Sequence, residues 1–167
     1  TEEIAGGMTR TMVLVHGAFV GGWCWEPFAA HFRRAGWRCL APDLRHHGPD
    51  APLAALGHTS LNDYTTDIAA LVRSLSEPPV LVGHSMGGLI CQKLAAEGLA
   101  EALVLLAPSP PWGVLSLSRG EIEARFGLLA AGLFWTRALR PSFRVAASHA
   151  LDKLEPRKTH DVSAEHQ

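Results

Sequence analysis

The sequence predicts an α/β protein in which a mostly parallel β-sheet lies between two layers of helices, a three-layer sandwich. Three observations predict this class. Apolar segments of strand length alternate along the chain with segments of helical periodicity. The strand segments are apolar on both faces, which is typical of a parallel sheet that helices cover on both sides. One of these strands leads through a Gly-x-Ser-x-Gly turn directly into a helix, a junction that recurs in enzymes built on parallel sheets.

The first elements alternate as this class requires. An apolar strand at 12–15 leads into a glycine-rich loop, and a helix is expected at 25–35, where Gly36 ends it. A short strand follows at 37–41. Residues 42–60 are rich in Pro, Gly and His, so we expect a loop there.

The next elements surround the serine turn. Asn62 is expected to cap a helix that continues to about Leu75, because apolar side chains recur there at helical spacing. The members of this apolar stripe are Tyr64, Ile68, Leu71, Val72 and Leu75. A strand at 79–82 precedes the serine turn, a helix at 89–97 follows it, and the last predicted strand is 102–106.

The order of elements divides the chain into four segments. Residues 1–10 form an N-terminal extension, and 11–111 form the α/β core. The alternation then stops, and apolar side chains at helical spacing predict a helical segment over 112–151. Its place in the chain favours a cap over the carboxyl ends of the strands, with ordinary core helices as the alternative. Residues 152–167 are polar without periodicity and are expected to form a loose tail.

Composition and charge exclude several classes of partner. The chain has 167 residues, of which 47% are hydrophobic, and a formal net charge of −1. Neither nucleic acid nor an acidic membrane surface is therefore expected as a partner. No apolar tract is long enough to span a bilayer, and the N-terminal residues lack the apolar core of a signal peptide. We expect a cytoplasmic protein whose partner is a small molecule.

Cysteine and histidine usage indicates neither a cofactor nor a metal. Cys24, Cys39 and Cys91 have no metal-binding spacing, and their apolar surroundings predict buried thiols in a reducing compartment. His46 and His47 form a loop pair without further ligands nearby, so we expect the pair to face solvent rather than to bind a metal.

The clearest functional signal is the turn Gly83-His84-Ser85-Met86-Gly87. Between a strand and a helix, this pattern is typical of the nucleophile elbow of serine hydrolases. The turn is expected to force Ser85 into a strained backbone conformation, and a side chain at either glycine would crowd it. The next helix would direct its free N–H groups toward the reacting centre. The alternative is a glycine-rich turn that only packs closely.

The end of the first strand supports the hydrolase interpretation. Acyl transfer needs two backbone N–H donors for the developing oxyanion, one after the nucleophile, here Met86, and one from the loop after an earlier strand. Gly17 and Ala18 lie in such a loop and are small enough to let the backbone approach a substrate carbonyl. We assign His16 a structural role, a hydrogen bond to the loop, because a base would have to reach Ser85.

With these motifs the chain resembles the α/β-hydrolase superfamily from about residue 12 to 109, and more loosely to 151. The segments that resemble its esterase branch, which includes plant methylesterases and hydroxynitrile lyases, are 13–18, 21–25, 41–44, 63–65 and 82–88. A serine at the elbow separates the chain from haloalkane dehalogenases of the same fold, which have an aspartate there.

The resemblance implies an activity and a set of site residues. It implies a serine hydrolase that acts on an ester with an apolar portion, through an acyl-enzyme on Ser85 and without a cofactor. It also implies that the amides of Ala18 and Met86 form the oxyanion hole. The residues in supporting positions are His16, Gly17, Gly83, His84 and Gly87.

The catalytic acid and base are not assigned. In this fold they follow the serine in the order Asp or Glu, then His, and the resemblance places them after two further strands beyond the cap. No such strands are visible, so we interpret the chain as the N-terminal part of the fold, ending within or just after the cap. The downstream candidates, none of which follows an apolar strand, are Glu121, Glu123, His149, Asp152, Glu155, His160, Asp161, Glu165 and His166.

The predicted strand 102–106 would lack a neighbour on one side, and such an exposed edge favours self-association. Three interpretations of function follow. The chain is part of an esterase, an inactive relative that binds a small apolar ligand, or a subunit that another chain completes. We favour the esterase because Ser85, its glycines and the loop 16–18 are intact.

Overall fold

The computed structural model describes residues 10–48, 50–111 and 114 of the chain. These residues lie in the first of the two compact units into which the chain divides, residues 1–114. Apart from Arg10 and Val114, the predicted N-terminal extension, cap and tail lie outside the described residues.

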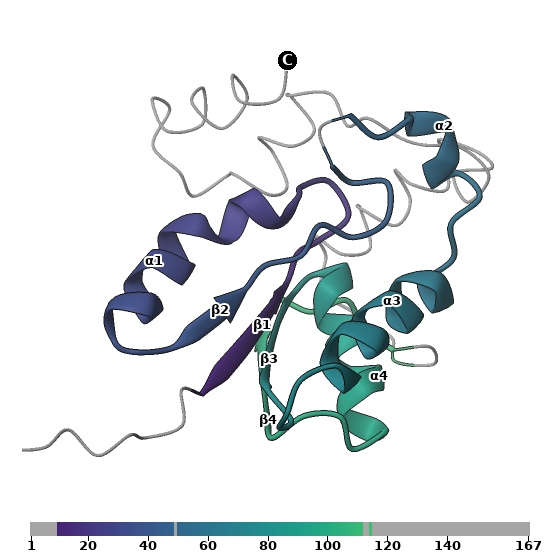
Figure 1. The fold of residues 1–167 in the computed structure, drawn as a ribbon. Coiled ribbons are helices and arrows are strands. Elements are labelled where there is room, and N and C mark those ends of the chain that lie inside the picture. Colours follow the sequence, from purple (N-terminus) through teal and green to yellow (C-terminus); the bar gives the residue numbers. More distant parts are fainter. Residues whose placement is uncertain (1–9, 49, 112–113, 115–167) are drawn as a thin grey trace, which may run out of the picture. The chain divides into compact units, whose positions relative to one another are not determined.

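A four-stranded parallel sheet forms the centre of the described unit (Figure 1). Its strands are β1 (Thr11–Val15), β2 (Arg38–Leu40), β3 (Val80–His84) and β4 (Ala102–Leu106). They lie in the order β2-β1-β3-β4, and each neighbouring pair is parallel. The parallel sheet predicted from strands that are apolar on both faces is therefore confirmed.

Helices cover both faces of this sheet (Figure 1). A short 3-10 helix, η1 (Gly22–Trp25), leads into α1 (Glu26–Arg34) on one face, while α3 (Leu61–Arg73) and α4 (Met86–Ala96) lie on the other. One further turn of helix, α2 (Leu53–Leu56), lies in the segment that was expected to be loop throughout. The expectation was wrong at this point because prolines and glycines permit a single helical turn between them.

The hydrophobic core consists of two clusters, one on each side of the sheet. Successive side chains of a strand point to opposite faces, so Met12 and Leu14 of β1 pack with the α1 side, whereas Val13 and Val15 pack with α3 and α4. All four side chains are at most 5% exposed. A strand buried on both faces has no polar face, and this explains the continuous apolar run in the sequence.

The strand β4 is the outermost strand of the described sheet next to β3. Its side chains alternate between exposed and half-buried, with Val104 at 42% and Leu106 at 40% exposure. These side chains point to the faces of the sheet, so their exposure does not test the unpaired backbone edge expected from the sequence. Self-association through this edge stays a prediction.

Two helix ends lie close to their predicted positions, whereas the start of α4 differs from the prediction. Gly36 and Gly98 follow α1 and α4 with φ values of 85° and 75°, the left-handed conformation that favours glycine at a helix end. The helix α4 begins at Met86 instead of at residue 89. It begins earlier because the carbonyl of Ser85 already accepts hydrogen bonds from the N–H groups of Gly88 and Leu89.

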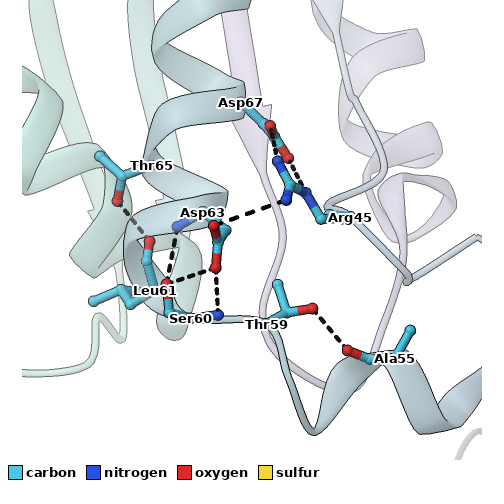
Figure 2. A network of polar contacts seen from close by, with 8 residues as sticks. All are labelled: Arg45, Ala55, Thr59, Ser60, Leu61, Asp63, Thr65 and Asp67. Atoms are coloured by element: carbon cyan, nitrogen blue, oxygen red, sulfur yellow. Dashed lines mark hydrogen bonds and ion pairs between the residues drawn. The ribbon is translucent and has the colours of Figure 1, made fainter.

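The N-terminal cap of α3 is Ser60, and the prediction of Asn62 was wrong. The Ser60 hydroxyl accepts a hydrogen bond from the N–H of Asp63 at 3.2 Å, and the Asp63 carboxylate accepts one from the Ser60 N–H at 2.8 Å (Figure 2). Hydrogen bonds from the Ser60 hydroxyl and N–H lower the pKa of Asp63. The Asn62 amide oxygen instead accepts a hydrogen bond from the Lys93 ammonium at 2.6 Å. Of the predicted apolar stripe, Tyr64, Ile68 and Val72 are buried, and Leu71 and Leu75 are partly buried.

Replacing Ser60 with alanine is expected to lower the free energy of unfolding by about 1 kcal/mol, the usual contribution of an N-cap side chain. Urea denaturation measures this change. Asn62→Ala is the control two residues further along, and it is expected to change the free energy of unfolding by less because it removes a surface side-chain contact and leaves the capping of the helix N–H groups intact. A larger loss for Asn62→Ala than for Ser60→Ala would restore Asn62 as the cap.

The loop after β2 is attached to α3 by one arginine (Figure 2). The Arg45 guanidinium donates two hydrogen bonds to the Asp67 carboxylate, at 2.9 Å and 2.6 Å, and its Nη1 lies 3.8 Å from the Asp63 carboxylate. These contacts hold the neighbouring residues Leu44 and His47 beside the end of β1. There the N–H of Leu44 donates to the His16 ring, and the His47 ring bonds to the carbonyl of Ala18.

The expected burial of the cysteine thiols is found for two of the three cysteines. Cys39 and Cys91 are buried and Cys24 is half-buried, and all three are free thiols. Burial raises the pKa of Cys91 to about 12 and that of Cys24 to about 11.

Among the described residues, no helix is long and apolar enough to cross a membrane, and no cluster of His, Cys, Asp and Glu could bind a metal ion.

Candidate active site

Ser85 lies at the apex of a sharp turn between β3 and α4. Its backbone has φ 52° and ψ −121°, a region that a residue with a side chain rarely adopts. Hydrogen bonds from the end of β4 maintain this conformation. The Ser85 N–H donates to the carbonyl of Leu106 at 3.2 Å, and its carbonyl accepts from the N–H of Ser109 at 2.9 Å. The strained backbone expected for the serine is therefore present, and the neighbouring strand stabilises it.

Two glycines are required at this turn because backbone atoms occupy the space of a side chain. A Cβ atom on Gly87 would lie 2.2 Å from the carbonyl oxygen of Val15 and 2.5 Å from that of His16. A Cβ atom on Gly83 would lie 2.6 Å from the carbonyl oxygen of Gly87. The first residues of α4 thus pack directly on the end of β1.

The loop after β1 lies beside the serine. A Cβ atom built on Gly17 would be 3.2 Å from the Cβ atom of Ser85 and 3.2 Å from Nδ1 of His84. This proximity arises because β1 and β3 are parallel neighbours, so that their carboxyl ends meet at one edge of the sheet. Met86 is the first residue of α4, where backbone N–H groups have no partner within the helix.

His16 is fully buried at the end of β1 and bonds with both ring nitrogens. Its Nε2 lies 2.9 Å from the N–H of Leu44, and its Nδ1 lies 2.7 Å from the carbonyl oxygen of Gly17. The N–H of Leu44 can only donate, so Nε2 is the acceptor and Nδ1 carries the hydrogen. Burial lowers the pKa of His16, which favours this neutral form. The structural role expected for His16 agrees with this geometry.

The hydrogen bond from His16 also sets the direction of the next amide. The carbonyl of Gly17 and the N–H of Ala18 belong to one planar trans peptide, in which the two groups point in opposite directions. Fixing the Gly17 oxygen on His16 therefore fixes the direction of the Ala18 N–H. This is the amide that the sequence resemblance assigns to the oxyanion hole.

His47 is half-buried and contacts two backbone carbonyls, which corrects the expectation that its side chain only faces solvent. Its Nε2 lies 2.9 Å from the carbonyl oxygen of Ala18, and its Nδ1 lies 3.0 Å from that of Arg45. The ring is half-buried, with its centroid 5.2 Å from that of His16 and 5.5 Å from that of Tyr64. Its partner Ala18 is distant in the sequence, so no local pattern could have indicated this contact.

Asp43, to which no role was assigned from the sequence, also contacts the glycine-rich loop. Its carboxylate accepts a hydrogen bond of 2.7 Å from the N–H of Gly22, the first residue of η1. A Cβ atom on Gly22 would lie 2.3 Å from the carbonyl oxygen of Ala41. The glycine-rich loop after β1 is thus attached to the end of β2 by a carboxylate and a close backbone contact.

The structure brings together the serine, its glycines and the loop after β1, but the acid and base are not among these residues. The downstream candidates for them, from Glu121 to His166, lie outside the described residues. Within the described part, His84 is adjacent to the serine in sequence but is exposed.

Comparison with known proteins identifies the family to which this fold belongs. The model of the alpha/beta hydrolase family matches residues 12–164. The chain therefore belongs to the α/β hydrolase family. An extracellular alpha/beta-hydrolase from a Paenibacillus species has the same fold, with a TM-score of 0.73 at 16% identity over 95% of this chain and 66% of that chain. Polyneuridine aldehyde esterase matches with a TM-score of 0.51 at 26% identity over 61% of this chain and 42% of that chain.

Several curated relatives are similar over about half of the chain. Methylesterase 3 of Arabidopsis thaliana is 39% identical over 80 residues, which are 47% of this chain and 30% of the relative. Salicylic acid-binding protein 2 of Nicotiana tabacum is 43% identical over 48% of this chain and 31% of its own length. The carbendazim hydrolyzing esterase of Nocardioides sp. is 37% identical over 50% of this chain and 34% of its length. The chain thus spans about a third of the length of these relatives.

Proposed function

We propose that the protein is a serine hydrolase that cleaves a carboxylic ester with an apolar portion, with Ser85 as its nucleophile. The observation that supports this most is the strained turn at Ser85, directly beside the Gly17 backbone at one edge of the sheet. A non-glycine residue in such a conformation is costly unless the surroundings maintain it, and such strain is concentrated at functional sites. The names of several relatives, which include methylesterases and esterases, support the choice of an ester as the substrate.

The chemistry follows from the positions of these groups. The Ser85 oxygen attacks the ester carbonyl carbon, and the carbonyl oxygen takes up the negative charge. The N–H groups of Ala18 and Met86 stabilise this oxyanion, because they are preorganised donors that need no rearrangement during the reaction. The C–O bond then breaks, the alcohol leaves with a proton, and an acyl-enzyme remains. Water attacks the acyl-enzyme, which releases the acid and restores the Ser85 hydroxyl.

A base must take the proton from Ser85 in the first step and return it to the leaving alcohol. In this fold the acid and base follow the serine in the chain, so we assign them to residues C-terminal to Ser85. The two other interpretations of the sequence, an inactive ligand-binding relative and a subunit completed by another chain, predict no reactive serine in the protein alone.

Labelling with a fluorophosphonate probe tests this proposal. We expect Ser85→Ala to reduce labelling at least about a thousandfold, because removal of the nucleophile removes the covalent step. Hydrolysis of a short-chain p-nitrophenyl ester should be lost in the same variant. Ser109→Ala is the matched control and should keep its labelling, since Ser109 contacts Ser85 through its backbone N–H.

Two results would contradict the proposal. One is equal labelling of Ser85→Ala and the unchanged protein, which would place the reactive group elsewhere. The other is a protein with a cooperative unfolding transition that neither labels nor hydrolyses the ester, which would favour the inactive relative or the completed subunit.

A further inference from the structure

Two histidine rings bond to the two peptide groups on either side of Ala18. His16 donates to the carbonyl of Gly17, which shares a peptide plane with the Ala18 N–H. The Nε2 of His47 lies 2.9 Å from the carbonyl of Ala18, which belongs to the next plane. The rings contact each other, with centroids 5.2 Å apart.

We propose that His47 is a positioning residue of the oxyanion hole. The inference rests on the proposed function of Ser85 and extends it to a residue outside the elbow and its strand. A peptide plane held at one end can still rock about the bonds to its neighbouring Cα atoms. When the plane after Ala18 is also held, this rotation is blocked, and the Ala18 N–H keeps its direction toward the substrate carbonyl. Preorganised donors are the ones that stabilise an oxyanion most.

The position of His47 is itself fixed by contacts with α3. Arg45, two residues earlier, bonds to Asp67 of α3 with two hydrogen bonds (Figure 2). The Nδ1 of His47 lies 3.0 Å from the Arg45 carbonyl, and the ring packs edge-on against Tyr64 of α3. A continuous set of contacts thus connects α3 with the loop that carries Ala18.

The bond to Ala18 depends on which ring nitrogen of His47 carries the hydrogen. The carbonyls of Ala18 and Arg45 only accept hydrogen bonds, and a neutral imidazole has one N–H to donate. The positioning role of His47 requires that this hydrogen is on Nε2, toward Ala18. A glutamine side chain places its NH₂ group near the position of Nε2, whereas an asparagine places it near that of Nδ1. His47→Gln should therefore keep the bond to Ala18, and His47→Asn and His47→Ala should lose it.

Isotope labelling can observe this one bond. Ala18–Phe19 is the only Ala–Phe pair in the sequence. Protein made with ¹³C-carbonyl alanine and ¹⁵N phenylalanine therefore gives a single carbonyl–amide correlation, which reports the carbonyl of Ala18. We expect its ¹³C shift to move in His47→Ala and His47→Asn and to return toward the unchanged value in His47→Gln.

The rate of Ser85 phosphonylation, measured on the same four proteins, gives the functional result. We expect a roughly tenfold to hundredfold lower rate in His47→Ala and His47→Asn, the size of effect that a small misplacement of a catalytic group produces. His47→Gln should recover most of the rate. Coincident thermal unfolding of the Asn and Gln variants would exclude a loss of folding as the cause.

The outcomes separate this inference from the proposed function. An unlabelled wild-type protein would refute the proposed function, and this inference with it. A labelled wild type with equal rates in the Asn and Gln variants would refute the positioning role alone. An Ala18 carbonyl signal that is unchanged in His47→Ala would also refute it, whatever the rates.

Discussion

Replacing Gly87 with alanine is expected to lower the free energy of unfolding by about 3 kcal/mol or more and to abolish labelling of Ser85. The new Cβ atom would lie 2.2 Å from the carbonyl oxygen of Val15 and 2.5 Å from that of His16. Both are backbone atoms at the end of β1, which is paired on both sides in the middle of the sheet. Relief of the clash must therefore move either β1 or the first turn of α4, and both positions support the serine.

Gly36→Ala is the matched control for this prediction. Gly36 has φ 85°, and nothing lies within 4 Å of its Cβ position. The free energy of unfolding of that variant should fall only by the conformational cost of an L-residue in the left-handed region, about 1–2 kcal/mol. Its Ser85 should still be labelled. Urea denaturation and probe labelling of the two variants measure the difference. A Gly87→Ala variant that is no less stable than Gly36→Ala would show that α4 does not pack closely on the end of β1.

Replacing His16 with phenylalanine is expected to lower the free energy of unfolding by roughly 2–4 kcal/mol at pH 8, because two buried backbone groups lose their partners. These groups are the N–H of Leu44 and the carbonyl of Gly17. The phenylalanine ring keeps the volume, so the loss reports the hydrogen bonds more than the packing. His31→Phe on the exposed face of α1 is the control, and it should be close to neutral.

The contribution of His16 should also depend on pH, in a direction set by its lowered pKa. Since the pKa of the folded state lies below the ordinary value of 6.5, the unfolded chain binds more protons between the two values. The contribution of His16 to the free energy of unfolding therefore has its full value above pH 6.5. It decreases as the pH falls from there toward the folded-state pKa. One proton limits the slope to about 1.4 kcal/mol per pH unit.

Denaturation of the unchanged protein and His16→Phe over a pH series measures this effect. The difference in the free energy of unfolding between the two should be constant above pH 6.5 and should shrink below it. A difference that grows as the pH falls would mean that His16 is stabilised in its charged form, and the tautomer deduced from Leu44 would then be wrong.

The fold could be predicted from the sequence to a large extent, because a strand that is buried on both faces consists of consecutive apolar residues. The strand β4 has the predicted boundaries, and β1 and β3 differ by only a residue or two from theirs. The end of α4 at Gly98 follows from local backbone geometry in the same way. The strain at Ser85 could also be predicted, because the motif and its two glycines occur together in a few consecutive residues.

Other features could not be predicted because they depend on partners far apart in the sequence. The cap of α3 is not one of these features, because Ser60 and Asp63 form the local capping-box pattern three residues apart, a signal that the prediction of Asn62 overlooked. Arg45 meets Asp67, and His47 meets Ala18, after the strands have brought their loops to one edge of the sheet. A loop rich in histidine and proline gives no indication of such contacts by itself.

The sequence by itself determined the class of fold, the position of the serine and the need for glycine around it. Each of these depends on short-range rules of periodicity, backbone conformation and side-chain size. Only the tertiary structure decided how the loop after β1 is held. The two histidines that bond around Ala18 come from the end of β1 and the loop after β2, and they become neighbours because parallel pairing aligns the ends of those strands. The physical reason is that hydrogen-bond direction depends on where separate segments meet, and residue order alone does not contain that information.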